Sequence, residues 1–131
     1  MKIKGLFLVS GLLILSVLLN GFRSESELSK LMRTMANDMK RVRVKVQKGE
    51  KVPMFYKKYH RINTAKPSVE SKKGERYPEY ANAFLIQLDR FGKAEKVDQK
   101  SEYNNLVKTC IRCHETYCPG PISMLKKLQL P

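Results

Sequence analysis

The feature that most constrains this chain is the string Cys110-Ile111-Arg112-Cys113-His114, which lies in a segment of helical periodicity near the C-terminus. From about Asp98 to Tyr117, apolar residues recur at intervals of three or four, a spacing that predicts one amphipathic helix. The two cysteines and the histidine share its apolar face with the other members of the pattern: Tyr103, Leu106, Val107 and Tyr117. The sequence therefore predicts two thiols and one imidazole on the buried side of a helix.

The spacing C-x-x-C-H is the pattern by which haem is attached covalently. Two thiols about one helical turn apart can each add to one of the two vinyl groups at the haem edge. Imidazole is the commonest proximal ligand of haem iron, and the adjacent histidine is placed to reach it. We therefore expect one covalent haem c, with Cys110 and Cys113 as its anchors and His114 as an iron ligand.

Three other uses of the same residues stay open. A C-x-x-C pair also serves thiol-disulfide exchange, but normally in a βαβ context for which this sequence gives no pattern. A zinc site needs a fourth ligand, and Cys118 could supply it only in a cramped loop. A simple structural disulfide is the third alternative.

The N-terminus has the layout of an export signal. Lys2 and Lys4 precede an uncharged apolar run from Gly5 to Phe22, and Arg23 follows it. We expect residues 1–22 to be a signal peptide or a membrane anchor, and residues 23–131 to be one domain with a tail after residue 118. The protein is then periplasmic, either soluble or tethered to the inner membrane.

The charge is strongly positive, with a formal net charge of +14. Such an excess invites a nucleic-acid interpretation, against which export argues, since little nucleic acid lies outside the cytoplasm. Complementary charge speeds encounters between proteins. The expected partner is therefore an acidic redox protein or an anionic membrane surface, with no nucleic acid.

The remaining pattern is helical throughout and predicts an all-α fold. A first helix is expected from about Glu25 to Lys48, with Ser24 as its cap and Gly49 as its stop. A second, shorter helix would begin at Pro53, with apolar positions at Phe55, Tyr59 and Ile62. Residues 67–76 read as a loop, a third helix spans about 77–92, and residues 122–130 form a short amphipathic turn or two. Helices joined in this way suggest an antiparallel four-helix bundle with a cofactor between them.

This arrangement resembles the class II c-type cytochromes, that is, cytochrome c-prime and its low-spin relatives. In that family the attachment motif lies on the last helix of a four-helix bundle, and here 17 residues follow His114. The segment Thr34-Met35-Ala36-Asn37-Asp38-Met39-Lys40-Arg41 resembles the family's first helix. The resemblance covers about residues 25–117 and also implies that a homodimer is possible.

The same resemblance implies that Met32 is the second axial ligand of the iron. Low-spin relatives carry a methionine near this position, where cytochrome c-prime has an apolar residue over an open iron. Methionines at helical spacing are more often core filling, and Met32, Met35 and Met39 form such a stripe. Met35, an open distal site, and the remote candidates Met54, His60 and Met124 stay as alternatives.

Cys118 departs from the family pattern, as does the proline-rich tail that follows it. One cysteine is left over once the haem takes two, and such a thiol is either buried or paired with another chain. We expect Cys118 to be buried against the tail.

The expected function is one-electron transfer by a non-enzymatic carrier, because histidine and methionine together fill both axial positions of the iron. The alternative is a five-coordinate haem protein that binds or senses a small diatomic gas. Both hypotheses depend on the same residue, Met32.

Overall fold

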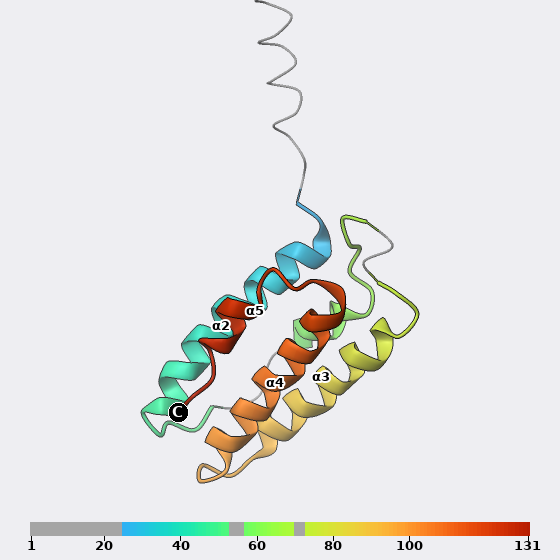
Figure 1. The fold of residues 1–131 in the computed structure, drawn as a ribbon. Coiled ribbons are helices and arrows are strands. Elements are labelled where there is room, and N and C mark those ends of the chain that lie inside the picture. Colours follow the sequence, from blue (N-terminus) through green and yellow to red (C-terminus); the bar gives the residue numbers. More distant parts are fainter. Residues whose placement is uncertain (1–24, 53–56, 70–72) are drawn as a thin grey trace, which may run out of the picture.

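The computed structural model describes residues 25–52, 57–69 and 73–131. These residues form α2 (Glu27–Gln47), the 3-10 helix η1 (Lys57–Ile62), α3 (Tyr77–Lys93), α4 (Gln99–Tyr117) and α5 (Ile122–Lys126) (Figure 1). The described part of the chain contains no β-strand, which confirms the all-α prediction. None of its helices is both long and apolar enough to cross a bilayer. The predicted signal or anchor segment lies outside the described residues.

Helix α2 begins and ends close to the predicted positions. Its cap is Ser26, whose hydroxyl accepts a hydrogen bond from the Ser29 backbone N–H at 3.2 Å. The predicted cap, Ser24, lies outside the described residues. After the helix, Gly49 has φ +69°, a left-handed conformation that glycine adopts without a Cβ penalty. One side of α2 is buried, and its buried apolar residues are Met35, Met39, Val42 and Val46.

The predicted second helix differs from the observed segment. Its first residues, including Pro53 and Phe55, lie outside the described residues, and the described remainder is a six-residue 3-10 helix. Tyr59 and Ile62 are buried, as the pattern predicts. Two apolar positions three residues apart suit a 3-10 turn as well as an α-helix, so the spacing could not distinguish them. The described residues contain three long α-helices, and the four-helix count stays a prediction.

A buried carboxylate joins η1 to α2. Asp38 accepts a hydrogen bond from the Tyr59 hydroxyl and forms ion pairs with Arg41 and, at 2.8 Å, with Lys58. Burial raises the pKa of Asp38, but the hydrogen bonds from Lys58 and Tyr59 and the charges of Lys58 and Arg41 outweigh burial, so the pKa lies below its ordinary value. The carboxylate therefore stays ionised and holds the 3-10 segment in place.

Helices α3 and α4 pack side by side as an antiparallel pair (Figure 1). Pro78 lies in the first turn of α3, where its missing N–H costs nothing, and α4 starts after the short connection 94–98. Phe91 and Tyr103 meet edge to face between the helices, with ring centroids 6.1 Å apart. At its first residue α4 also holds the segment that follows α2, because the buried Gln99 side chain pairs with both backbone groups of Val52, at 2.9 and 3.0 Å.

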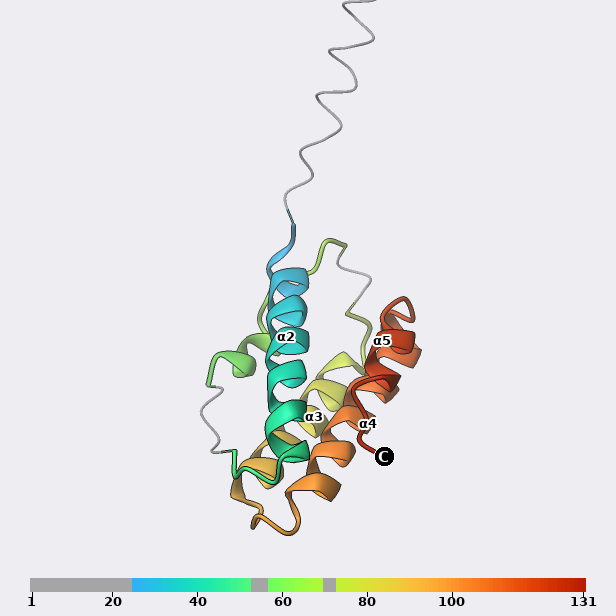
Figure 2. The same ribbon diagram turned by 90° about the vertical axis from the view of Figure 1, so that its left-hand side faces the viewer.

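The C-terminal tail is part of the core. Helix α5 packs on α4, and Leu125, Leu128 and Leu130 are buried. The Tyr103 hydroxyl lies 3.0 Å from the Leu128 carbonyl, and the Asn104 side chain bonds both backbone groups of Leu130, at 2.8 and 3.0 Å. Figure 2 shows α2 on one side of the molecule, and α5 with the end of α4 on the other side.

Candidate functional site

A cavity of about 370 Å³ lies between α2 and the C-terminal half of α4. This volume falls within the range of small-molecule and cofactor sites, about 300–1,000 Å³. Its walls come from α2, α3, α4, the loop at Pro67 and Ser68, and the C-terminal tail, and most lining side chains are apolar. Those outside the motif and the methionines include Leu28, Ala36, Pro67, Tyr77, Phe84, Val107, Tyr117, Pro121, Leu125 and Leu128.

All three residues of the attachment motif line this cavity. Cys110, Cys113 and His114 lie on α4 within its last two turns, as the helical spacing predicts. Cys113 is buried, whereas Cys110 and His114 are partly exposed because they face the open space. The fold therefore turns both thiols and the imidazole towards one apolar volume.

The orientation of His114 is set by the end of its own helix. Its Nδ1 lies 2.9 Å from the backbone carbonyl oxygen of Cys118. A carbonyl oxygen only accepts hydrogen bonds, so Nδ1 carries the proton and donates it. Nε2 then keeps its lone pair, the form in which imidazole binds a metal.

The surroundings of both motif thiols raise their pKa values. Burial raises the pKa of Cys110 to about 12 and that of Cys113 to about 11. Cysteines that catalyse disulfide exchange have the opposite property, a lowered pKa that yields the reactive thiolate at neutral pH. The electrostatic environment therefore does not favour the disulfide-exchange alternative.

Methionines form much of the facing wall. Met32, Met35 and Met39 on α2 and Met124 on α5 line the cavity. Met35 and Met39 are buried, whereas Met32 is partly exposed. His60 is exposed on η1 and does not line the cavity, and Met54 lies outside the described residues. Among the predicted candidates for a second axial ligand, the cavity brings together Met32, Met35 and Met124 with the motif.

Polar lining side chains gather at the start of α2. Ser26, Ser29 and Arg33 come from its cap and first two turns, and Ser68 comes from the facing loop. Arg33 also pairs with Glu25 at 2.7 Å. An apolar volume with two thiols, an imidazole, methionine thioethers and one guanidinium at its edge suits a flat apolar group with anionic substituents. The residues present therefore fit a haem.

Cys118 is exposed, which corrects the expectation that it is buried against the tail. Pro119 stops the helix directly after it, so the side chain lies at the cavity rim while the carbonyl turns back to His114. All three cysteines are free. Within the described residues no group of three or more His, Cys, Asp and Glu side chains is arranged to hold a metal ion, so the zinc alternative gains no geometric support.

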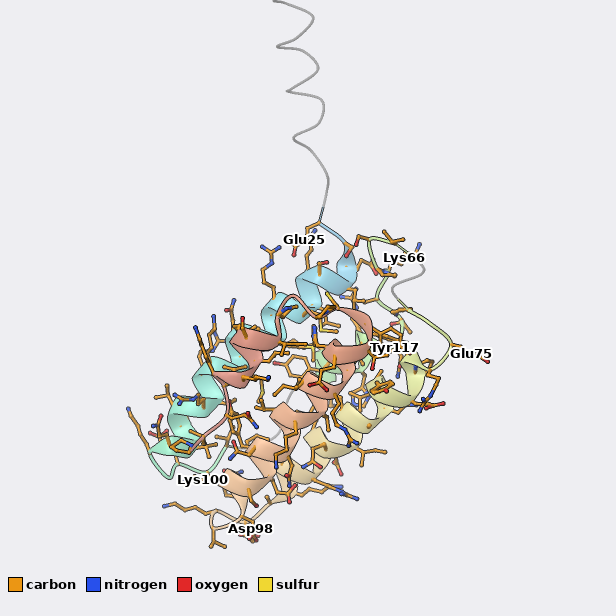
Figure 3. All side chains as sticks on the ribbon, in the orientation of Figure 1. Glu25, Lys66, Glu75, Asp98, Lys100 and Tyr117 are labelled. Atoms are coloured by element: carbon orange, nitrogen blue, oxygen red, sulfur yellow. The ribbon has the colours of Figure 1, made fainter. Side chains whose placement is uncertain are left out.

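Two parts of the site were not predicted. The tail, to which the sequence assigned no role, supplies Pro121, Met124, Leu125 and Leu128 to the wall. The i, i+3 spacing of Leu125 and Leu128 is the signal that could have placed them on one face. An aromatic group closes the other end: Tyr117 meets Tyr77 and Tyr80 edge to face, each with centroids 5.7 Å apart. Figure 3 shows Tyr117 at the end of α4, towards α3.

Comparison of the chain with models of protein families, with curated protein sequences and with solved structures finds no match. The functional argument therefore depends on the chemistry of the cavity.

Proposed function

We propose that this chain is an exported mono-haem c-type cytochrome that carries one electron. Cys110 and Cys113 would attach the haem, and His114 and Met32 would be its axial ligands. The observation that carries the proposal is that two thiols, an imidazole and a methionine thioether face one apolar cavity of about 370 Å³. The resemblance of the sequence to the class II cytochromes points in the same direction.

Each motif thiol has a defined task in this proposal. Each sulfur would form a C–S bond to one carbon of a vinyl group, and the thiol hydrogen would go to the other carbon of that group. The addition changes no net oxidation state, so it needs no external oxidant. Burial keeps both thiols protonated, which is the form that supplies this hydrogen. The cysteines lie on one helix, which fixes the separation of the two anchors.

His114 and Met32 would be the residues that hold the iron. The Cys118 carbonyl keeps the His114 proton on Nδ1 and so leaves the Nε2 lone pair for the iron. The bound haem supplies an iron centre that cycles between the ferric and ferrous states. Methionine ligation raises the reduction potential of such a centre, and two protein ligands leave no position for a substrate. The apolar lining excludes water, which limits solvent rearrangement as the charge changes.

A second candidate function follows from the wall around Met32. Leu28, Met35 and Ala36 line the same wall and carry no side-chain hydrogen-bond donor, whereas Ser29 supplies a hydroxyl beside them. If Met32 does not ligate, the iron is five-coordinate with an apolar distal face, and this arrangement suits a small diatomic ligand. The two candidates share the same cavity and differ in the sixth ligand.

The deciding test is the optical spectrum of the protein matured with a haem-attachment system. We expect a low-spin spectrum in both oxidation states that does not change when carbon monoxide is added to the reduced protein. A high-spin spectrum that shifts with carbon monoxide would support the gas-binding candidate instead. A protein that leaves the attachment system without covalent haem would contradict both.

A further inference from the structure

The outer side of α2 carries a continuous line of basic residues. Positions 30, 33, 37, 40, 41, 44 and 48 follow helical spacing and lie opposite the buried positions 35, 39, 42 and 46. We call this set the α2 basic stripe: Lys30, Arg33, Asn37, Lys40, Arg41, Val44 and Lys48. It contains five cations and no acid, and Val44 is 47% exposed within it.

Three cations of the α2 basic stripe are not neutralised by the fold. Lys30, Lys40 and Lys48 are exposed and form no ion pair with the described residues. Arg33 and Arg41 pair with Glu25 and Asp38. In Figure 3, nitrogen-tipped side chains project from the outer edge of α2.

Most of the excess positive charge lies in one part of the molecule, residues 27–66. Residues 27–66 contain twelve lysines and arginines against three acids, whereas residues 77–117 contain six against six. A cationic coat that served solubility alone would be spread over both parts. The asymmetry indicates a face with an anionic partner.

The position of the α2 basic stripe favours a membrane surface over an acidic redox protein. Arg33 alone of its members lines the cavity, so most of the stripe is directed away from the site that a redox partner must approach. The stripe extends along a helix of 21 residues, about 31 Å at 1.5 Å per residue. Glu27 is the fifth residue after Phe22, so α2 begins within about 17 Å of the end of the predicted export segment.

We propose that the α2 basic stripe binds anionic phospholipid, so that the domain lies on the membrane with α2 against the lipid headgroups. The proposal rests on the export that is part of the proposed function, and it names the partner of the basic surface. Basic residues next to a membrane segment attract anionic lipid in an additive way. Exposed Val44 adds a small apolar contact near the C-terminal end of the stripe.

The test is partition of the full-length protein into vesicles, with the triple variant Lys30→Gln, Lys40→Gln and Lys48→Gln. The matched control is Lys96→Gln, Lys100→Gln and Lys108→Gln. These three exposed lysines lie within residues 77–117, where the charges balance, and they also form no ion pair with the described residues. Both variants lose the same charge. Vesicles of equal parts phosphatidylglycerol and phosphatidylcholine are compared with phosphatidylcholine alone, and the ratio of the two partition coefficients removes the contribution of the apolar N-terminal segment.

Each cation at an anionic surface contributes roughly fivefold to binding. We therefore expect the ratio to fall by more than about tenfold in the stripe variant, and by less than about threefold in the control, because charges beyond a Debye length of about 10 Å are screened. Equal losses in both variants would overturn the proposal. A wild-type protein that partitions equally into both kinds of vesicle would also overturn the proposal. An acidic protein would then be the expected partner of the stripe. The absorption spectrum of the same samples reports haem attachment separately, so failure of the proposed function is distinguishable.

Discussion

Met32 and Met35 line the same wall of the cavity, yet the proposed function gives an iron-binding role to Met32 alone. We predict that Met32→Leu leaves the haem attached but converts the low-spin spectrum to a high-spin one that responds to carbon monoxide. Leucine keeps the apolar volume and removes the sulfur, so the change reports ligation rather than packing. The measurement is the absorption spectrum in both oxidation states.

The control for this substitution is Met35→Leu, which alters an equally apolar side chain one helical turn away. We expect its spectrum to match that of the unaltered protein, because Met35 is buried core packing at the cavity wall. An unchanged spin state in Met32→Leu, or a changed one in Met35→Leu alone, would move the sixth ligand to another residue.

At the scale of elements, the attachment of η1 to α2 depends on the ionised carboxylate of Asp38. Its pKa is lower in the folded state than its ordinary value of 3.8. The stabilisation is therefore complete above pH 3.8 and is lost as the pH falls through the lower, folded-state pKa. Asp38→Asn should lower the free energy of unfolding by about 1–3 kcal/mol near neutral pH, because it removes charge-assisted hydrogen bonds to Lys58 and Arg41.

Chemical denaturation at neutral and acidic pH checks this prediction. The difference between Asp38→Asn and the unaltered protein should shrink as the pH falls below 3.8. The control is Asp89→Asn, which breaks the exposed i, i+4 pair with Lys93 and should cost less than about 1 kcal/mol at any pH. A cost for Asp38→Asn that stays constant with pH would show that the carboxylate charge is not what holds η1.

One of the groups that hold the tail is the buried hydroxyl of Tyr103. Tyr103→Phe removes the donor that lies within hydrogen-bonding distance of the Leu128 carbonyl, at 3.0 Å, and of the Met39 carbonyl, at 3.3 Å. We predict a loss of about 1–3 kcal/mol in the free energy of unfolding, because a buried acceptor is left without its partner. We also expect faster proteolysis after residue 118, because the tail then opens more easily.

Tyr80→Phe is the comparison for Tyr103→Phe. The Tyr80 hydroxyl has an exposed threonine partner, Thr116, at 3.3 Å, and water can replace this bond. We expect a cost within about 0.5 kcal/mol and no change in tail proteolysis. Equal effects from both tyrosines would mean that the tail is not held through Tyr103.

The elements differ in how well their sequence predicted them, for physical reasons. The ends of α3 and α4 are marked by residues close to them in the sequence. The predicted starts at Tyr77 and Asp98 therefore lie within one residue of the observed ones. The segment at 57–62 has too few periodic positions to separate an α-helix from a 3-10 helix. Pro119 predicts that the helix ends near Cys118. The end of the helix does not determine whether the tail covers the Cys118 side chain, which the structure shows to be exposed.

The candidate site also contains residues that the sequence predicted and residues that it did not. Helical spacing alone placed Cys110, Cys113 and His114 on one face, because the period of an α-helix is fixed by the backbone. The tail wall could not be predicted, since it depends on tertiary hydrogen bonds from Tyr103 and Asn104 that no local pattern records. The structure brings Met32 to the same cavity as the motif, and its ligation of iron stays a prediction.

At the scale of the whole molecule, the cavity occupies space that a small domain needs for its core. A chain of this size buries little apolar surface. Side chains that line an unfilled cavity lose the van der Waals contacts that a filled core would give them. A tethered haem is present in both the folded and the unfolded chain, so it stabilises only through contacts made in the folded state. Filling a quarter of the 370 Å³ cavity would contribute about 2 kcal/mol at roughly 24 cal/mol per Å³.

We therefore predict that the melting temperature of the haem-loaded protein exceeds that of the haem-free protein by at least about 10 °C, since each kcal/mol shifts Tm by about 4–8 °C at this size. Thermal unfolding followed by far-ultraviolet circular dichroism measures the difference. The double variant Cys110→Ser and Cys113→Ser, passed through the same attachment system, should carry no covalent haem and melt with the haem-free protein. Cys118→Ser should retain the haem, because Cys118 lies outside the attachment motif. Equal melting temperatures for loaded and haem-free protein would mean that the attached haem lies outside the cavity, and the geometric basis of the proposed function would be lost.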